Sequence, residues 1–293
     1  MLNKNTIAVV VPCYNEEAQI GLVIETMPKF VDRIIIVDDK SIDTSIEVVK
    51  KYISNKKFNV RNKILRPAEK IKNSFNSAEM ILQQKNKDEI AYFDKHQVIN
   101  DNVYDRIILI QKERNTGNGK SISIGLKWCK DNNINFSAIM DGDGQMDPDE
   151  LETILLPLDK GVSDYVKGNR LRYPGAWTVI PKIRFIGNSI LSILTKLASG
   201  FWSVSDTQTG FIAFSLKALN SIKLYNIYGK YGWPNDILIK LNIAYCTIKE
   251  VTIKPVYSVG EKSKMNIFKV VFPISWLLFK GFFKRLLWRY LIN

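Results

Sequence analysis

The sequence of 293 residues is poor in the side chains that most often carry zinc and nucleophile chemistry. His96 is its one histidine, and the HExxH motif of metalloproteases requires two, so that class is excluded. A Ser-His-Asp triad would have to contain His96. The three cysteines, at positions 13, 129 and 246, are far apart and form no CxxC pair. Neither a disulfide framework nor a zinc knuckle is therefore indicated, and a reducing compartment is favoured.

Long apolar runs are also missing from the sequence. No stretch of 18 residues is both apolar and uncharged. The longest candidate, residues 270–279, lies between Lys269 and Lys280 and contains Pro273, so it is short for a membrane span. The N-terminal residues show no apolar core of a signal peptide. We therefore expect a cytosolic protein that touches a membrane peripherally, from the cytoplasmic face.

Acidic residues are absent from the C-terminal end of the chain. The formal net charge is +13, and residues 262–293 contribute seven Lys and Arg with no Asp or Glu. Such an excess predicts either nucleic acid or an anionic membrane as the partner. The same segment holds 8 of the 32 aromatic side chains, which favours the membrane.

Helical spacing of about 100° per residue sorts the side chains of this tail into two arcs. One arc is aromatic and apolar, and consists of Phe279, Phe282, Phe283, Leu286 and Tyr290. The other arc is basic, and consists of Lys280, Lys284, Arg285 and Arg289. The pattern predicts that residues 265–293 form an amphipathic helix on an anionic membrane surface, with the cations on lipid headgroups.

Buried β-branched runs alternate with helical segments through the first half of the chain. The expected strands are 7–11, 34–37, 107–110 and 136–140, and the expected helices between them are 15–27, 43–51 and 120–130. This alternation predicts a mostly parallel central sheet with helices on both faces. We expect a helical insertion at 66–105 and, after residue 150, strands at 164–167, 210–214 and 248–256 with helices at 180–197 and 233–241. One continuous domain over residues 1–264 is expected, followed by the tail.

Two strand ends in this pattern are acidic, and ligands of parallel sheets bind beyond the carboxyl ends of the strands. Asp141 and Asp143 flank Gly142 at one end. Two carboxylates so placed can share Mg²⁺ or Mn²⁺, and the glycine lets the backbone approach a phosphate. Asp38 and Asp39 end another strand, where a carboxylate can accept hydrogen bonds from a base or a ribose.

Residues 115–121 (NTGNGKS) look like a phosphate loop but do not match one. GxxxxGKS requires glycine where Arg114 stands, and the sequence contains no GxGxxG. A Walker ATPase and a Rossmann dehydrogenase are therefore disfavoured. A glycine turn before a helix can still receive an anion at the helix N-terminus, so Gly119 and Lys120 are predicted to bind the nucleotide sugar or its phosphates.

Six motifs occur in one order along the chain: 11–16 (VPCYNE), 37–43 (VDDKSID), 115–120 (NTGNGK), 141–148 (DGDGQMDP), 168–170 (GNR) and 206–211 (DTQTGF). Together they resemble family 2 of the inverting glycosyltransferases over about residues 6–265. The resemblance is greatest to the branch of dolichyl-phosphate mannose synthase and the bacterial polyprenyl-phosphate glycosyltransferases.

The resemblance implies a GT-A fold, a nucleoside-diphosphate sugar donor and a Mg²⁺ or Mn²⁺ cofactor. It implies a nucleotide pocket lined by Pro12, Tyr14, Glu16, Asp38 and Asp39. Asp141 and Asp143 match the metal-binding DXD motif of the family, with Gln145 beside them. Arg170 matches an arginine that approaches the diphosphate or the acceptor phosphate, and Asp206 matches an acidic residue near the acceptor.

The sequence departs from the family pattern at two places. Lys40 stands where the Asp-Asp-Gly-Ser motif has glycine, so we expect that loop to follow a different course. Ser258 and Val259 stand where the family often has an arginine. Lys262 or Lys264 is then expected to supply that charge to the acceptor phosphate.

The implied reaction is a single in-line displacement at the anomeric carbon. A lipid phosphate acceptor is already anionic and needs no strong base, whereas a hydroxyl acceptor would need one, for which Asp236 is the candidate. A nucleotidyltransferase is the nearest rival, because its metal-carboxylate site is similar. A nucleic-acid-binding module is disfavoured, because the acidic strand ends would repel phosphate, and no nucleic acid partner is expected. The sequence leaves oligomerisation open.

Overall fold

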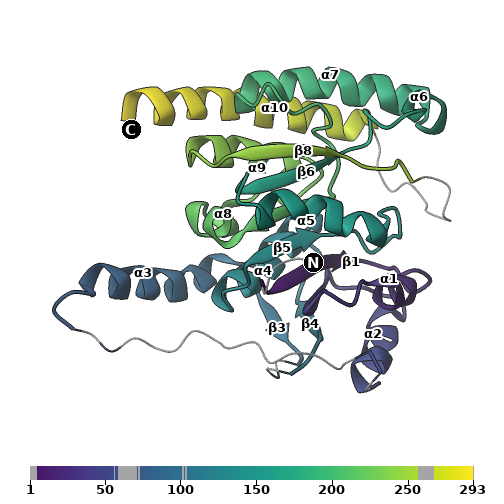
Figure 1. Ribbon diagram of the computed structural model, residues 1–293, viewed down its shortest axis with the longest axis vertical. Coiled ribbons are helices and arrows are strands. Elements are labelled where there is room, and N and C mark those ends of the chain that lie inside the picture. The colour runs from purple at the N-terminus through teal and green to yellow at the C-terminus, as the bar shows by residue number, and fades with distance from the viewer. Residues whose placement is uncertain are drawn as a thin grey trace.

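The computed structural model describes residues 5–55, 57–58, 71, 73–100, 102, 104–256 and 267–292, the side chains of 183–184 and 267–270 excepted. An eight-stranded sheet in the order β3-β4-β2-β1-β5-β7-β6-β8 forms its centre (Figure 1). The strands are β1 (Ile7–Cys13), β2 (Arg33–Asp38), β3 (His96–Val98), β4 (Ile107–Lys112), β5 (Phe136–Ile139), β6 (Tyr165–Asn169), β7 (Ile212–Ser215) and β8 (Ile248–Thr252).

Most strand pairs of this sheet are parallel, as predicted. β1 pairs in parallel with β2 and β5, β2 with β4, and β6 with β8. Only β3 at one edge, and β7 between β5 and β6, run antiparallel to their neighbours. The parallel strands therefore bring their carboxyl ends, including both acidic ones, to one edge of the sheet.

Both faces of the sheet are covered by helices because its central strands are apolar on both sides. Alternate residues of β1 belong to different cores: Val9 packs on the side of α1 (Ile20–Thr26), α2 (Ser45–Ser54) and α5 (Leu151–Asp159). Val10 packs on the side of α4 (Asn118–Asp131), α8 (Leu216–Ser221) and α9 (Trp233–Ile243). The prediction of helices on both faces is therefore confirmed.

The first helix begins later than predicted. We expected a helix from residue 15, but α1 begins at Ile20. Asn15 adopts φ 55°, and its side-chain oxygen accepts a hydrogen bond from the Ile42 amide at 2.9 Å. The Glu16 amide donates to Ser45 Oγ at 2.9 Å. Asn15 and Glu16 therefore do not begin a helix, because their hydrogen bonds hold the loop after β2 beside β1.

The insertion between β2 and β4 is only partly helical. It contains α3 (Ser77–Asp88), a 3₁₀ turn η1 (Glu89–Tyr92) and the unpredicted edge strand β3. Polar contacts hold it against the end of α4, among them Lys130 Nζ with Glu89 Oε2 at 3.1 Å and Asn86 Nδ2 with Asp131 Oδ1 at 2.7 Å. In Figure 1, α3 extends away from the sheet on the side opposite α1 and α2.

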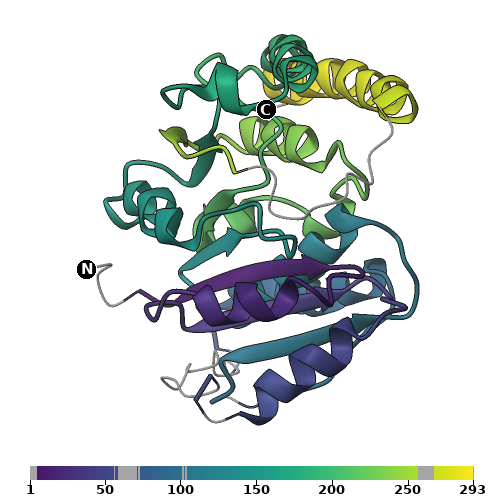
Figure 2. The same ribbon diagram turned by 90° about the vertical axis from the view of Figure 1, so that its right-hand side faces the viewer.

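Two long helices form an additional layer over α9. These are α7 (Lys182–Ser199), preceded by the short α6 (Ala176–Val179), and α10 (Ile267–Leu286), which continues as the π-helix η4 (Leu287–Ile292). Figures 1 and 2 show α7 and α10 side by side at one end of the molecule. Ile274 and Leu278 of α10 are buried against α7 and α9. Among the described residues, no helix is long and apolar enough to cross a membrane.

Two of the basic tail residues face the protein and not its surroundings, which corrects the predicted basic arc. Arg285 is buried, and it donates to the carbonyl oxygens of Ala198 (2.9 Å) and Leu197 (3.2 Å) at the end of α7. Arg289 donates to the Asn242 carbonyl at 2.7 Å, at the end of α9. The last carbonyls of a helix have no intrahelical donor, so these guanidinium groups complete both helix ends.

Lys40 has φ 65°, in the left-handed region that favours glycine, so the loop after β2 keeps a conformation that a glycine would adopt. A course of this loop that differs from the family pattern stays a prediction. Because left-handed backbone strains a side chain, Lys40→Gly should leave the free energy of unfolding in urea within about 1 kcal/mol of wild type or raise it. Lys40→Val should lower it by more than about 1 kcal/mol.

Lys29→Gly is the matched control, because this exposed lysine has no positive φ. Glycine there gains no strain relief and should only lower the free energy of unfolding. Equal losses for Lys29→Gly and Lys40→Gly would contradict the strained loop.

Candidate active site

A cavity of about 1390 Å³ opens at the carboxyl ends of the parallel strands. One end is polar and is formed by residues at or directly after the carboxyl ends of β1, β2 and β5: Pro12, Cys13, Tyr14, Glu16, Asp39, Asp141, Gly142, Asp143 and Gln145. The other end is apolar and is formed by α7 and α10: Ile190, Leu191, Leu194, Val271 and Ile274. The cavity thus joins the acidic strand ends to the helical layer.

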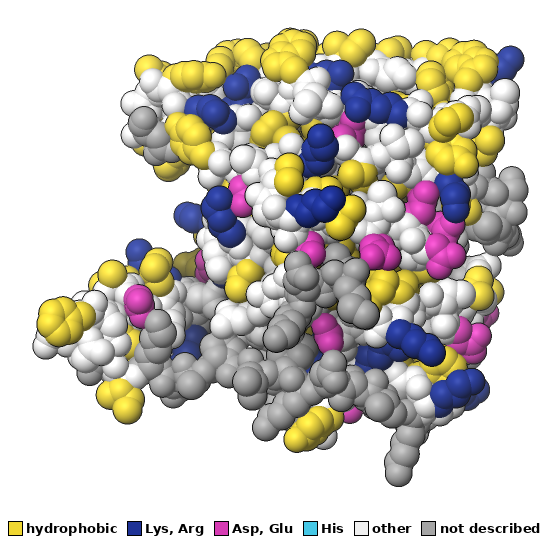
Figure 3. Space-filling view, viewed as in Figure 1, with side chains coloured by type: hydrophobic (Ala, Val, Ile, Leu, Met, Phe, Trp, Pro, Cys, Tyr) yellow, Lys and Arg dark blue, Asp and Glu magenta, His cyan; other side chains and the backbone are white. Residues whose placement is uncertain are grey.

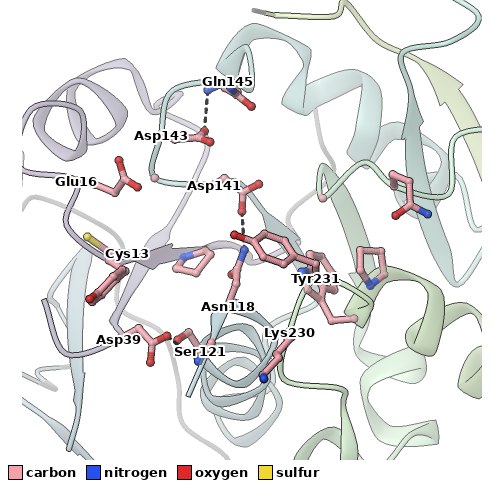
Figure 4. A pocket seen from close by; sticks show the side chains of 18 of the residues that line it. Cys13, Glu16, Asp39, Asn118, Ser121, Asp141, Asp143, Gln145, Lys230 and Tyr231 are labelled. Atoms are coloured by element: carbon pink, nitrogen blue, oxygen red, sulfur yellow. Dashed lines mark hydrogen bonds between the residues drawn. The ribbon is translucent and has the colours of Figure 1, made fainter. Parts of the chain in front are cut away.

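Asp141 and Asp143 both face this cavity from the turn after β5 (Figure 4). Asn118 Nδ2 approaches Asp141 Oδ1 at 3.4 Å, and the Gln145 amide donates to Asp143 Oδ1 at 3.0 Å. Gly210 leaves room for the first carboxylate, since a Cβ there would lie 3.2 Å from Asp141 Oδ2. Burial and the charge of Asp143 raise the pKa of Asp141 to about 7.

These two carboxylates are the donors that a hard cation would use. In the part of the chain that the structure describes, no group of three or more His, Cys, Asp or Glu side chains is placed to hold a metal ion. Mg²⁺ commonly takes one or two carboxylates and completes its shell with water and substrate phosphates. Asp141 and Asp143 fit that mode of binding, and the charge repulsion between them is what a dication would relieve.

Asp39 lines the cavity and also holds the start of α4. Its Oδ1 accepts hydrogen bonds from Lys112 Nζ at 2.5 Å and from the Thr116 amide at 3.0 Å, and its Oδ2 accepts one from the Gly117 amide at 2.9 Å. The two backbone amides directly before α4 therefore donate to a carboxylate of the protein itself. Sequence reasoning had expected a phosphate there.

Gly119 and Lys120 do not line the cavity, although we predicted both as ligand contacts. The Gly119 amide donates to the Gly229 carbonyl at 2.9 Å, and a Cβ on Gly119 would lie 2.0 Å from the Tyr228 carbonyl oxygen. Lys120 Nζ donates to the Tyr225 carbonyl at 2.9 Å. The glycine-rich segment is used for close packing between α4 and the loop before α9.

Asp38 and Cys13 are buried residues at the polar end of the cavity. Asp38 is buried, lies outside the cavity lining and accepts hydrogen bonds from the Ser41 amide, which shapes the turn at Lys40. Cys13 lines the cavity but is 2% exposed. Burial, followed by the charge of Asp38, raises the pKa of its thiol to about 12, so the sulfur stays protonated and is no nucleophile.

Arg170 directly follows β6 and lines the cavity, and the buried Asp206 fixes its guanidinium group. Arg170 Nε and Nη2 donate to the two carboxylate oxygens of Asp206 at 2.8 and 3.1 Å. Asp206 is fully buried and does not line the cavity. Burial by itself raises the pKa of Asp206, but the charge and hydrogen bonds of Arg170 hold it below the ordinary value. Asp206 therefore acts on the site through the arginine.

The structure does not bring Asp236 into the cavity. This side chain, in the first turn of α9, accepts hydrogen bonds from the Tyr228 amide at 2.8 Å and from Lys240 Nζ. The contacts fix the loop before α9, from which Lys230 and Tyr231 reach the cavity next to Asn118 (Figure 4).

Sequence reasoning missed Lys230 and Tyr231, and it missed the contribution of α7. The available signal for the loop was the pair of glycines, Gly229 and Gly232, directly before a helix. For α7 the signal was an apolar helix with no partner of its own in the βα alternation. The predicted phosphate-binding residues Lys262 and Lys264 lie outside the described residues.

Solved structures with the same fold include glucosyl-3-phosphoglycerate synthase from Mycobacterium tuberculosis, in complex with Mn²⁺ and uridine-diphosphate-glucose. It matches with a TM-score of 0.57 and 17% identity, over 96% of this chain and 79% of that chain. The complex of the same enzyme with uridine-diphosphate matches with a TM-score of 0.54 and 18% identity, over 96% and 80%. These likenesses concern the fold, which is GT-A-like.

Curated relatives match along nearly the whole chain. The UDP-N-acetylglucosamine–dolichyl-phosphate N-acetylglucosaminyltransferase of Methanococcus voltae is 28% identical, over 92% of this chain and 95% of that protein. An uncharacterized protein of Methanocaldococcus jannaschii is 24% identical, over 93% and 92%. The model of the family "Glycosyl transferase family 2" matches residues 8–77 and 93–223, which are more than half of the chain. The protein thus belongs to glycosyl transferase family 2, and it is a glycosyltransferase that uses a nucleotide sugar.

Proposed function

We propose that the protein transfers a sugar, with inversion, from a nucleoside-diphosphate sugar to a polyprenyl phosphate of the dolichyl or undecaprenyl type. The observation that carries this proposal is the shape of the cavity, which runs from Asp141 and Asp143 to an apolar end formed by α7 and α10. A sugar nucleotide suits the first end and an isoprenoid chain the second. The name of the relative from Methanococcus voltae supports the same pair of substrates.

The donor would lie at the polar end, with its nucleotide over Pro12, Tyr14, Glu16 and Asp39. Mg²⁺ or Mn²⁺, held by Asp141 and Asp143, would neutralise charge on the leaving diphosphate when bound. Arg170, which lines the same cavity, would present a planar group of donors to phosphate oxygens. Because Asp206 already fixes this guanidinium, little side-chain entropy is lost when phosphate binds.

A phosphate acceptor agrees with the chemistry of this cavity better than a hydroxyl does. A phosphate oxygen is already anionic and attacks without a strong base, so catalysis rests on positioning and electrostatics. The alternative acceptor, a hydroxyl of a glycan or lipid-linked saccharide, relied on Asp236 as the base. That carboxylate lies outside the cavity lining and bonds Lys240, which weakens the alternative.

The acceptor would reach the cavity from a membrane that covers α7 and α10. Large apolar side chains of both helices are exposed on this face: Ile186, Ile190, Ile193, Leu194, Leu197, Val271, Phe272, Trp276, Phe279 and Phe283. Figure 3 shows hydrophobic side chains along this end of the molecule, with Lys and Arg below them. Ile190, Leu194 and Val271 belong both to this face and to the cavity lining, so the apolar surface continues inside.

This arrangement supports the proposal that the protein attaches peripherally to a membrane, for which we propose the cytoplasmic face. Lys280 and Lys284 are exposed on α10 and remain available to anionic headgroups, each contributing about 1 kcal/mol. Arg285 and Arg289 are used within the protein. The attachment therefore depends on apolar insertion over two helices more than on the charge of the tail.

The transfer itself is tested with a panel of nucleotide sugars that includes UDP-N-acetylglucosamine, incubated with Mg²⁺ or Mn²⁺ and a polyprenyl phosphate. We expect metal-dependent release of a nucleoside diphosphate and a loss of more than about 100-fold in kcat for Arg170→Lys, because an ammonium cannot replace the fork. The exposed Lys217→Ala serves as the control. Release of pyrophosphate from a nucleoside triphosphate would favour a nucleotidyltransferase instead.

Removing the charge of Asp141 should stabilise the fold while abolishing transfer. Its folded pKa of about 7 lies above the ordinary 3.8, so the folded protein binds more protons than the unfolded one between these values. Stability from this group is present at low pH and is lost as the pH rises towards 7. In a chelating buffer at pH 8, Asp141→Asn should raise the free energy of unfolding by about 1 kcal/mol or more.

The gain from Asp141→Asn should shrink by pH 5, where the wild-type carboxyl is itself protonated in the folded state. The exposed Asp149→Asn should leave stability and transfer unchanged at both pH values. A loss of stability in Asp141→Asn at pH 8 would show that the carboxylate is not repelled there.

Membrane attachment is tested by flotation with vesicles of phosphatidylglycerol and phosphatidylcholine. Ile193→Glu on α7 and Phe279→Glu on α10 each place a charge on the exposed apolar face without entering the cavity lining. Each should cut the bound fraction at least tenfold, since a carboxylate opposes insertion. Leu156→Glu, an exposed position on α5, is the matched control and should bind as wild type does. Unchanged flotation of both helix variants would refute this membrane face.

A further inference from the structure

A second buried carboxylate, that of Glu250, accepts a hydrogen bond from the backbone of the Arg170–Asp206 pair. Glu250 comes from β8, which pairs in parallel with β6, the strand that ends beside Arg170. Its side chain is 4% exposed and lies outside the cavity lining. Neither the proposed transfer nor the motifs of the sequence give this residue a role.

Glu250 holds the backbone that carries Asp206. Its Oε1 accepts hydrogen bonds from the amides of Ser205 and Asp206 at 2.7 and 2.9 Å. Its Oε2 accepts one from Asn169 Nδ2 at 2.7 Å, at the end of β6. One carboxylate therefore ties the strand end directly before Arg170 to the loop that carries the arginine's partner.

Asp206 continues the same chain of contacts toward the cavity. In addition to the guanidinium, it accepts hydrogen bonds from the Arg170 amide at 3.1 Å and from the Thr209 amide at 3.2 Å. The buried Lys167 closes the cluster, donating to the Thr209 carbonyl at 2.6 Å. Both acceptor carboxylates in this path, Glu250 and Asp206, have buried side chains. Little solvent is therefore available to replace the hydrogen bonds that are lost when the first carboxylate is displaced.

We propose that Glu250 is a positioning residue for transfer, fixing Asp206 and through it the direction in which the Arg170 guanidinium enters the cavity. The inference rests on the proposed function, because Arg170 is assigned to the phosphates only there. A shift of about 1 Å in a group that stabilises a transition state can cost about 100-fold in rate. The effect of Glu250 should therefore appear in kcat and should exist only while Arg170 is present.

The test is a double-mutant cycle of Glu250→Gln and Arg170→Lys, with kcat and KM for transfer and the melting temperature measured on all four proteins. Glutamine keeps the shape and one acceptor but loses the charge and the second acceptor. We expect Glu250→Gln to lower kcat about tenfold or more with less change in KM, and to lower it no further in the double variant. Independent, multiplicative losses would overturn the proposal.

A second readout does not depend on the acceptor. In protein labelled with ¹⁵N-arginine, the Arg170 Nε–H resonance is assigned by its loss in Arg170→Lys, and Glu250→Gln should shift or broaden it. An unmoved resonance would overturn the proposal even if kcat falls. If polyprenyl phosphate is the wrong acceptor, wild type fails in transfer while the resonance still responds, which separates the two failures.

Two further variants complete the design. Glu47→Gln, the same change at an exposed position of α2, should leave the resonance, kcat and melting temperature unchanged. Glu250→Asp keeps the charge but shortens its reach toward the Ser205 and Asp206 amides, so it should also move the resonance. It replaces Glu250→Gln if the glutamine variant does not fold.

Discussion

The constraint on which this structure depends is the repulsion among carboxylates that a parallel sheet brings to one edge. Two carboxylates near this edge, Asp39 and Asp206, are neutralised by the protein itself. Asp39 accepts hydrogen bonds from Lys112 and from the two amides directly before α4. Asp206 accepts hydrogen bonds from Nε and Nη2 of Arg170. At Asp141 the pKa remains raised, so the charge of this edge is unbalanced at the position where a dication and a diphosphate would bind.

The helical layer of α7 and α10 adds an apolar surface beside this acidic edge of the sheet. α7 and α10 close the cavity on one side and expose apolar side chains on the other. Arg285 ties the two helices together through the last carbonyls of α7, which makes α10 part of the folded body. A lipid acceptor would need an apolar path for its chain and a site for its phosphate, and the apolar side chains of this layer line the same cavity as Arg170.

The sequence predicted what depends on local pattern and missed what depends on tertiary contact. Runs such as 7–11 and 34–37 predicted buried parallel strands, and the acidic strand ends indicated where the cavity lies. Nothing in the pattern of residues 115–121 distinguishes glycines that approach a phosphate from glycines that pack against Tyr228 and Gly229. The arc of basic residues in the tail likewise could not show that Arg285 turns inward, because its acceptors lie almost ninety residues away on α7.

In the reaction that we propose, a lipid phosphate oxygen displaces a nucleoside diphosphate from the sugar. The most direct measurement is the structure of the lipid product, determined by ³¹P and ¹H nuclear magnetic resonance after incubation with an α-linked nucleotide sugar. We predict a sugar joined to the polyprenyl chain through a single phosphate, with the anomeric configuration inverted. A diphosphate linkage, a retained configuration, or a sugar on a hydroxyl group would contradict this reaction.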